Sequence, residues 1–228
     1  LGVPVYSALG NHEYWNGAPS LFFAHFPRLE GAHHYKVALG PLWLLFIDSN
    51  QDEQTASEWE TQRQWLSTEL ASLGCAREAR GAIVVDHHPP FTNSTVTHDE
   101  PQVQALLPLL AGEPRALGVW SGHVHSYERF QRGGKLLVTS GGGGGPRARL
   151  LEGPSRRHTD DLYPGPPLRP FTFVLYELTE QGLSAEVHGL EKGGHDFAVI
   201  DRFALPFPDV AHSPNACLSE SRPSTGPE

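Results

Sequence analysis

Short apolar runs, each ended by glycine, proline or polar residues, recur along the first two thirds of the chain and predict an α/β protein. The turn signal Gly40-Pro41 separates two of these runs and predicts that they form a hairpin. The runs that read as strands are Val3–Leu9, His34–Leu39, Leu42–Asp48, Ala82–Asp86, Leu117–Ser121 and Leu136–Ser140.

Two segments between these runs have helical spacing. The first begins at Ser57, which forms a capping pair with Glu60, places its leucines on one face and ends at Gly74. The second covers residues 103–110, and Pro108 is expected to bend or shorten it. Helices between strands in this way are typical of an α/β fold.

The last third of the chain has a different pattern. Residues 141–170 hold seven glycines and six prolines without periodicity, which is typical of a long functional or disordered loop. Alternating strands then predict an antiparallel end of the fold over 171–178, 183–190 and, less regularly, 196–203. We therefore divide the chain into a domain over 1–205 and a Pro/Ser-rich tail over 206–228 that is expected to be disordered.

Charge excludes several classes of partner. The net charge is −9, from 17 basic and 26 acidic residues, so neither a nucleic acid nor an anionic membrane surface is an expected partner. The longest wholly apolar stretch, Leu42–Ile47, is far shorter than the ~20 residues of a membrane span, which predicts a soluble chain. Two cysteines, Cys75 and Cys217, leave the redox compartment open.

Histidines follow three of the predicted strands directly. They occur in Gly10-Asn11-His12-Glu13, in His87-His88-Pro89 and in Gly122-His123-Val124-His125. Because groups just beyond the carboxyl ends of neighbouring strands meet in one crevice of an α/β sheet, the three clusters predict one shared site. Neutral imidazoles and an asparagine carbonyl suit a transition metal, so the site is expected to bind metal.

The order GNHE, then a strand with HHP, then GHVH resembles the second half of the calcineurin-like metallophosphoesterase signature. The longer string GHVHSYER and the strand that feeds five glycines resemble the purple acid phosphatase branch more narrowly. The similarity covers roughly residues 3–146. It implies that the complete domain is a four-layer α/β/β/α sandwich, with two mixed sheets face to face and helices outside. This chain, incomplete at the N-terminus, is expected to supply one sheet and part of the other.

The resemblance also implies roles for single residues. His87 is preferred to His88 as a ligand because the ligand in the family lies two positions before the proline, and His88 is interpreted as a supporting neighbour. His98 is a weaker match because it lies in a variable loop. The implied roles are one metal bound by Asn11, His87 and His123, a second metal bound by His125, and contacts to the substrate phosphate from His12, as general acid or transition-state stabiliser, and from His98.

Other candidate groups have simpler interpretations. The glycine run at 141–145 lacks the Lys-Ser/Thr of a nucleotide-binding loop and is read as a tight turn near the site. Arg129 is read as a structural residue. Six further histidines are read as surface or turn residues: His33, His34, His158, His188, His195 and His212.

The implied reaction is hydrolysis of phosphate monoesters by a metal-bound hydroxide, with a small phosphorylated molecule as substrate. Two ions, of iron, zinc or manganese, would activate the hydroxide and hold the phosphoryl oxygens during in-line attack, and His12 and His98 would assist the leaving group. Two alternatives stay open: a phosphodiesterase of the same superfamily, and a truncated remnant that binds at most one metal without turnover.

The acidic blocks that the family places in its N-terminal half are absent from these residues. No acidic residue precedes Asn11, and Asp48 and Asp86 occupy other positions of the family pattern. The first residue is Leu1 and the chain has no methionine, so we expect the C-terminal part of a longer chain. Alone it is expected to be inactive and poorly soluble, because missing strands would leave an open edge. The resemblance alone suggests a secreted or periplasmic protein.

Overall fold

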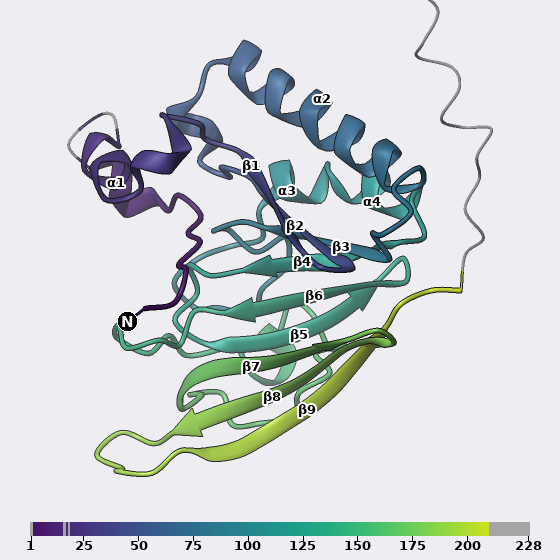
Figure 1. Cartoon of the computed structure of the whole chain (residues 1–228). Helices are drawn as coiled ribbons and strands as arrows, with labels where there is room; N and C mark the ends of the chain where they lie inside the picture. The colour runs from purple at the N-terminus through teal and green to yellow at the C-terminus, as the bar shows by residue number, and fades with distance from the viewer. Residues whose placement is uncertain (1, 16, 18, 210–228) are drawn as a thin grey trace, which may run out of the picture.

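A mixed six-stranded sheet is the centre of the computed structural model, which describes residues 2–15, 17 and 19–209 (Figure 1). Its strand order is β1-β2-β3-β4-β6-β5, in which β2, β3, β4 and β6 are parallel and the edge strands β1 and β5 are antiparallel. The six strands are β1 Tyr35–Leu39, β2 Leu42–Phe46, β3 Gly81–Val85, β4 Ala116–Ser121, β5 Tyr127–Arg132 and β6 Lys135–Ser140.

Helices cover one face of this sheet (Figure 1). In α2, Leu66, Leu70 and Leu73 recur at helical spacing and are buried against apolar side chains of β2, β3 and β4. The predicted helix is confirmed, but its predicted cap is wrong: Thr55 and Glu58 form the capping box. The helices are α1 Ser20–His25, α2 Ala56–Leu73, α3 Pro101–Gln104 and α4 Leu107–Ala111.

A three-stranded antiparallel sheet covers the other face. It consists of β7 Phe171–Thr179, β8 Gly182–Leu190 and β9 Ala198–Pro206, in that order. Ile83 of the large sheet and Leu183 of the small sheet share one apolar cluster between the two layers. The outer face of the small sheet carries no α-helix within the described residues, and Leu175 on it is 57% exposed. The structure therefore contains three of the four layers expected from the sequence.

The segment Val3–Leu9 is not a strand, so this prediction is wrong. No described strand pairs with it, and Val3 and Val5 are 64% and 50% exposed. Side chains hold its carbonyls instead: Tyr35 donates to Ser7 O at 2.7 Å and Asn50 donates to Leu9 O at 3.3 Å. Strand-forming residues make a strand only when a neighbour can pair with their backbone.

Two further local differences have simple causes. Strand β5 was not predicted, because its sequence YERFQR carries charges at positions that tertiary contacts bury, including Glu128 at 0% exposure. The helix predicted over 103–110 is two short helices, α3 and α4, with Pro108 in the first turn of α4. A proline fits there because its missing N–H has no helical acceptor to lose.

The hairpin predicted from the turn signal is confirmed. The hairpin β1–β2 turns at Gly40-Pro41, and residues 141–170 contain no named strand and only one short 3₁₀ turn, Gly153–Ser155. Strand β9 ends at Pro206 and Phe207 is buried, so the fold continues past the predicted boundary at 205, and residues 210–228 of the predicted tail lie outside the described residues. Within the described part of the chain no helix has the length and apolar character needed to cross a membrane.

Candidate metal centre

The parallel pairing of β3 and β4 brings two of the predicted histidine clusters together. Val85, near the end of β3, pairs with Trp120 near the end of β4. Beyond the strands the pairing continues, because Gly122 donates its N–H to the His87 carbonyl at 3.0 Å. His87 and His123 therefore emerge from neighbouring strand ends at the same edge of the sheet.

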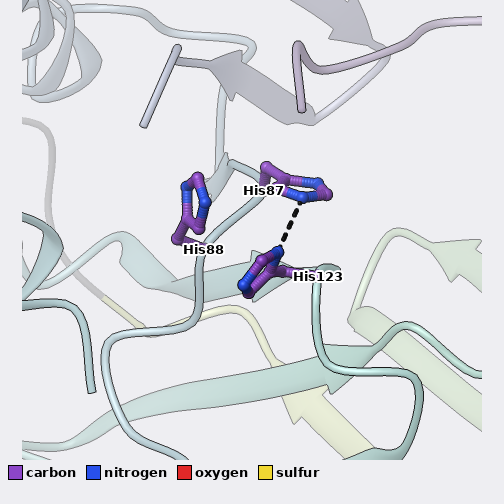
Figure 2. Close-up of side chains that lie close together, drawn as sticks. All are labelled: His87, His88 and His123. Atoms are coloured by element: carbon purple, nitrogen blue, oxygen red, sulfur yellow. Dashed lines mark hydrogen bonds between the residues drawn. The ribbon is translucent and has the colours of Figure 1, made fainter. Parts of the chain in front are cut away.

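Three imidazoles meet at this edge. His87 Nε2 lies 3.1 Å from His123 Nδ1, and Figure 2 shows this contact with the His88 ring beside it. One ring nitrogen from each of His87, His88 and His123 lies within 4.8 Å of the others. We call these three residues the histidine cluster.

Asn11 is a further polar residue in contact with His87. Its Oδ1 lies 2.9 Å from His87 Nε2, the same atom that faces His123 Nδ1. A single ring N–H can be directed well at only one of these two acceptors. A cation among the three atoms would instead take a lone pair from each, which is how imidazole and amide ligands bind a metal.

Polar contacts behind Asn11 hold its 3₁₀ turn, Asn11–Tyr14, to the end of β2. The Tyr14 hydroxyl donates to Asp48, and His33 Nδ1 lies 2.9 Å from Asp48 Oδ2. Asp48 is fully buried and is also bound by Asn50 through its backbone N–H and its side chain. His33 lies in a bend with its side chain 37% exposed, as its interpretation as a surface or turn residue predicts, but no local sequence pattern indicates its contact with Asp48.

Burial keeps the cluster neutral. Desolvation lowers the pKa of His87 to about 3, helped by the neighbouring imidazoles, and lowers the pKa of His123 to about 4 for the same reasons. Desolvation also lowers the pKa of His88, although the Asp48 charge opposes this. Because a metal binds the neutral imidazole, the rings are in the ligating protonation state at neutral and mildly acidic pH.

Close backbone approach explains two of the glycines. A Cβ at Gly10 would lie 2.9 Å from the His87 ring, and a Cβ at Gly145 would lie 2.6 Å from Cε1 of His125. Both distances are shorter than carbon atoms tolerate, so larger residues would displace the rings. This agrees with the interpretation of the glycine run at 141–145 as a tight turn near the site.

The backbone of His123 is strained. Its φ is +58°, in the left-handed region that costs a non-glycine residue of order 1–3 kcal/mol. Such a conformation persists only where the surrounding contacts impose it, and it is common at functional sites. Here it turns the ring toward His87.

A pocket of about 370 Å³ opens beside the cluster and contains the other predicted groups of GNHE and GHVH. His12 is exposed and its ring lies 3.8 Å, centroid to centroid, from that of Trp15. His125 Nδ1 lies 2.8 Å from the Pro146 carbonyl, which leaves Nε2 for a ligand. The lining residues are Asn11, His12, His87, Val96, Thr97, His123, His125, Pro146, Arg147 and Ala148.

His98 and His88 both differ from the sequence-based expectation: His98 lies outside the pocket lining, and His88 belongs to the cluster. His98 is exposed and is not part of the pocket lining, whereas its neighbour Thr97 is. His88, read as a supporting residue, contributes a ring nitrogen to the cluster, while its Nδ1 lies 2.9 Å from Ser49 Oγ. The paired His87-His88 was the available signal, and the spacing rule could not tell that both rings turn inward.

Carboxylates stay outside the cluster. Asp86 directly precedes His87 and is buried, and burial raises the pKa of its carboxyl well above the usual range, only partly offset by Ser121. Hydrogen bonds from His33, Tyr14 and Asn50 outweigh the effect of burial on Asp48 and hold its pKa below the usual range. Neither belongs to the group of ligand atoms that the described residues form.

The donor set fits one metal ion. Two nitrogens bound to one zinc at ~2.0–2.1 Å and a tetrahedral angle are about 3.4 Å apart, close to the 3.1 Å between His87 Nε2 and His123 Nδ1. With Asn11 Oδ1 and the His88 ring nearby, up to four protein atoms are available. The histidine cluster and Asn11 thus form a candidate site for one ion, and His125 lies near enough to line the same pocket.

Comparison with known proteins finds one matching family model and relatives among plant phosphatases. The family model for calcineurin-like phosphoesterases matches residues 1–127. Purple acid phosphatase 22 of Arabidopsis thaliana is 36% identical over 122 residues, which cover 49% of this chain and 27% of that protein. Probable purple acid phosphatase 20 of the same plant is 27% identical over 139 residues, covering 56% and 30%. The matched segments span less than a third of these curated relatives.

Two solved structures have folds similar to that of this chain. GAP50, described as the anchor in the inner membrane complex of Plasmodium, superimposes with a TM-score of 0.67 at 18% identity over 99% of this chain and 76% of that chain. A dimetal phosphatase from Danio rerio superimposes with a TM-score of 0.56 at 16% identity, covering 89% and 72%. At these identities the likeness shows the fold.

Proposed function

Because the chain belongs to the calcineurin-like phosphoesterase family, we propose that its pocket binds a metal and serves, in the complete protein, to hydrolyse phosphate monoesters. The observation that carries the proposal is the convergence of Asn11 Oδ1 and His123 Nδ1 on one atom, His87 Nε2, at 2.9 and 3.1 Å. Three lone-pair donors at this spacing, two of them on imidazole rings kept neutral by burial, are suited to a cation.

A metal bound here would supply Lewis-acid polarisation of a phosphoryl oxygen and of a water molecule. Asn11, His87 and His123 would hold it, with His88 as a fourth candidate. His12 lines the same pocket and is exposed to it, so it is placed to hold or deliver a proton at the oxygen of the leaving group. His125 would contribute to a second ion.

The pocket supports a small, anionic substrate. A volume of about 370 Å³ suits a small phosphorylated molecule, and Arg147 lies in its wall as the basic residue of the lining. Iron, zinc and manganese are all compatible with imidazole and amide ligands.

The test uses this chain and the complete product of the gene that encodes it. Each is purified, loaded with Zn²⁺, Mn²⁺ or Fe³⁺, analysed for metal content and assayed with p-nitrophenyl phosphate and bis(p-nitrophenyl) phosphate. We expect one ion per copy of this chain, loss of that ion in His87→Ala, and monoester turnover by the complete product that falls in His12→Ala.

Three results would contradict the proposal. A complete product that is loaded with metal but turns over neither ester supports a non-catalytic protein. Faster cleavage of the diester indicates a phosphodiesterase. Unchanged monoester turnover in His12→Ala removes His12 from the reaction.

A further inference from the structure

Two residues of the long glycine- and proline-rich loop contact the loop beside the metal site. We call Arg157 and His158 the strap, and residues 92–99 the pinned loop. We propose that the strap is a positioning device: it holds Thr97 so that Thr97 fixes the orientation and tautomer of the metal ligand His123. This inference rests on the proposed function, since it concerns the same metal site.

Arg157 binds three carbonyls of the pinned loop. Its Nε donates to Thr92 O at 2.9 Å, and its Nη2 donates to Ser94 O at 2.6 Å and to Thr97 O at 2.9 Å. The planar guanidinium presents its donors in a fixed geometry, so one side chain sets the relative positions of three peptide groups. The carbonyl of Thr97 is thereby held directly by the strap.

His158 binds both ends of the pinned loop. Its Nε2 lies 2.9 Å from each carboxylate oxygen of Asp99, and its side chain is only 15% exposed. Its backbone exchanges two hydrogen bonds with the buried side chain of Asn93, at 2.8 and 2.9 Å. Together with Arg157, it fixes the chain on both sides of Thr97.

The pinned loop is also tied to the central sheet. The buried Glu128 carboxylate of β5 accepts hydrogen bonds from the hydroxyl of Thr92 and from the backbone N–H of Asn93. Glu128 thus anchors the loop at Thr92 and Asn93, whereas the backbone carbonyl of Thr97 is bound by Arg157 of the strap.

The backbone carbonyl of Arg149 holds the middle of the loop by accepting hydrogen bonds from the N–H and the hydroxyl of Thr95, and this carbonyl is kept in any Arg149 side-chain variant. The strap holds the end of the loop that approaches the metal site, at Thr97 and Asp99.

Thr97 transmits this position to His123. Its Oγ1 lies 3.3 Å from His123 Nε2, while Nδ1 of the same ring faces His87 Nε2 at 3.1 Å. A ring that offers the Nδ1 lone pair to a metal carries its proton on Nε2 and donates it to Thr97. Outer-shell acceptors of this kind fix the tautomer and direction of ligating histidines, and their loss typically lowers metal affinity 10–100-fold.

The contact between Thr97 and His123 also helps to hold His123 in its strained backbone conformation. With φ at +58°, the residue does not adopt its conformation by local preference. The contact between Thr97 Oγ1 and His123 Nε2 holds the ring from the side opposite His87. The sequence pattern indicates no role for Arg157 and predicts a surface or turn position for His158, whereas both residues bind the pinned loop.

The experiment measures Co²⁺ affinity and the Co²⁺ absorption spectrum of this chain, together with hydrogen exchange of peptides covering 92–99. The variants are Arg157→Gln, Thr97→Val and the conservative Thr97→Ser. The matched control is Arg149→Gln, because Arg149 lies in the same long loop but its side chain pairs with Glu152 at the surface. Exchange in peptides of β3 and β4 reports whether each variant keeps its fold.

We expect Arg157→Gln to speed exchange in 92–99 and to weaken Co²⁺ binding about tenfold with a changed spectrum. Thr97→Val should weaken Co²⁺ to a similar extent without faster exchange, and Thr97→Ser should restore the affinity. Arg149→Gln should change neither quantity.

Unchanged Co²⁺ affinity in Thr97→Val, or faster exchange in Arg157→Gln with wild-type affinity and spectrum, would overturn the inference and leave the proposed function standing. A wild-type chain that binds no Co²⁺ would overturn the proposed function, and the inference with it.

Discussion

Two groups of histidines that look alike in the sequence occupy different surroundings in the fold. His87, His88 and His123 lie directly beyond the ends of the adjacent parallel strands β3 and β4, and their ring nitrogens meet within 4.8 Å. His125 belongs to the same motif as His123, and His98 lies in the loop that follows His87 and His88. Both are further from the strand ends, and His98 is exposed outside the pocket lining. Strand pairing therefore determines which histidines converge, because only residues next to the last backbone hydrogen bonds inherit the register of the sheet.

The largest difference between the groups should appear on removal of His87. We expect His87→Ala to weaken Zn²⁺ binding by more than about 100-fold, above the range for loss of an outer-shell partner. Isothermal titration of the metal-free chain measures this. His195→Ala is the matched control, because His195 is exposed in the loop between β8 and β9. Wild-type affinity in His87→Ala would exclude His87 as a ligand.

The next effect is on the pH dependence of metal binding. An ordinary histidine binds a proton below pH ~6.5. Since burial lowers the pKa of His87 to about 3 and that of His123 to about 4, Zn²⁺ binding should persist down to about pH 5. Titrations between pH 7.5 and 4.5 measure this, and a midpoint near 6.5 would contradict the burial of the cluster.

The same shifts determine the sign of the pH effect on the metal-free fold. Above about pH 6.5 both the folded and unfolded chains hold these histidines neutral, whereas between about pH 6.5 and 4 the unfolded chain binds protons that the folded chain does not. The free energy of unfolding should therefore fall as the pH falls through this window. Urea unfolding at pH 7.5, 6 and 5 tests this, and His87→Gln should show a shallower decline.

A smaller effect concerns the stability of glycine and alanine variants, which should differ in opposite directions at His87 and His123. Because His123 has a left-handed backbone, His123→Gly should be more stable than His123→Ala by about 1 kcal/mol, as glycine avoids the steric cost. Both variants should bind Zn²⁺ weakly. His87 is not among the described residues with positive φ, so His87→Gly should be less stable than His87→Ala. Equal stabilities of the two His123 variants in urea unfolding would show that the site imposes no such strain.

The smallest effect on metal binding should come from His98. Its exposed position outside the pocket lining predicts that His98→Ala leaves Zn²⁺ affinity within about twofold of wild type. If His98 contacts substrate in the complete protein, the same variant should lower monoester turnover by about 100-fold. Unchanged turnover would remove His98 from the reaction and leave the metal site unaffected.

The sequence alone predicted most of the elements that place the site. Periodicity identified the hairpin, α2, β3, β4, β6 and the antiparallel end, because each has a regular apolar face or a short β-branched run. It failed at Val3–Leu9, where strand-like residues find no pairing neighbour, and at β5, whose Glu128 is buried only because Thr92 and Asn93 bind it. These failures share one cause: the partner that decides the outcome is distant in the sequence.

The residues of the site likewise fall into two groups, those placed by local sequence and those placed by contacts distant in the sequence. The placement of His87 and His123 at strand ends is a local property, and the sequence by itself determined that these two residues share an edge of the sheet. Asn11 joins them from a 3₁₀ turn that no described strand precedes. Tertiary structure decided that His88 joins them, that His33 binds Asp48 and that Thr97 faces His123. Local pattern encodes where a strand ends, whereas ring direction, burial and the strained φ of His123 depend on contacts that only the folded chain brings together.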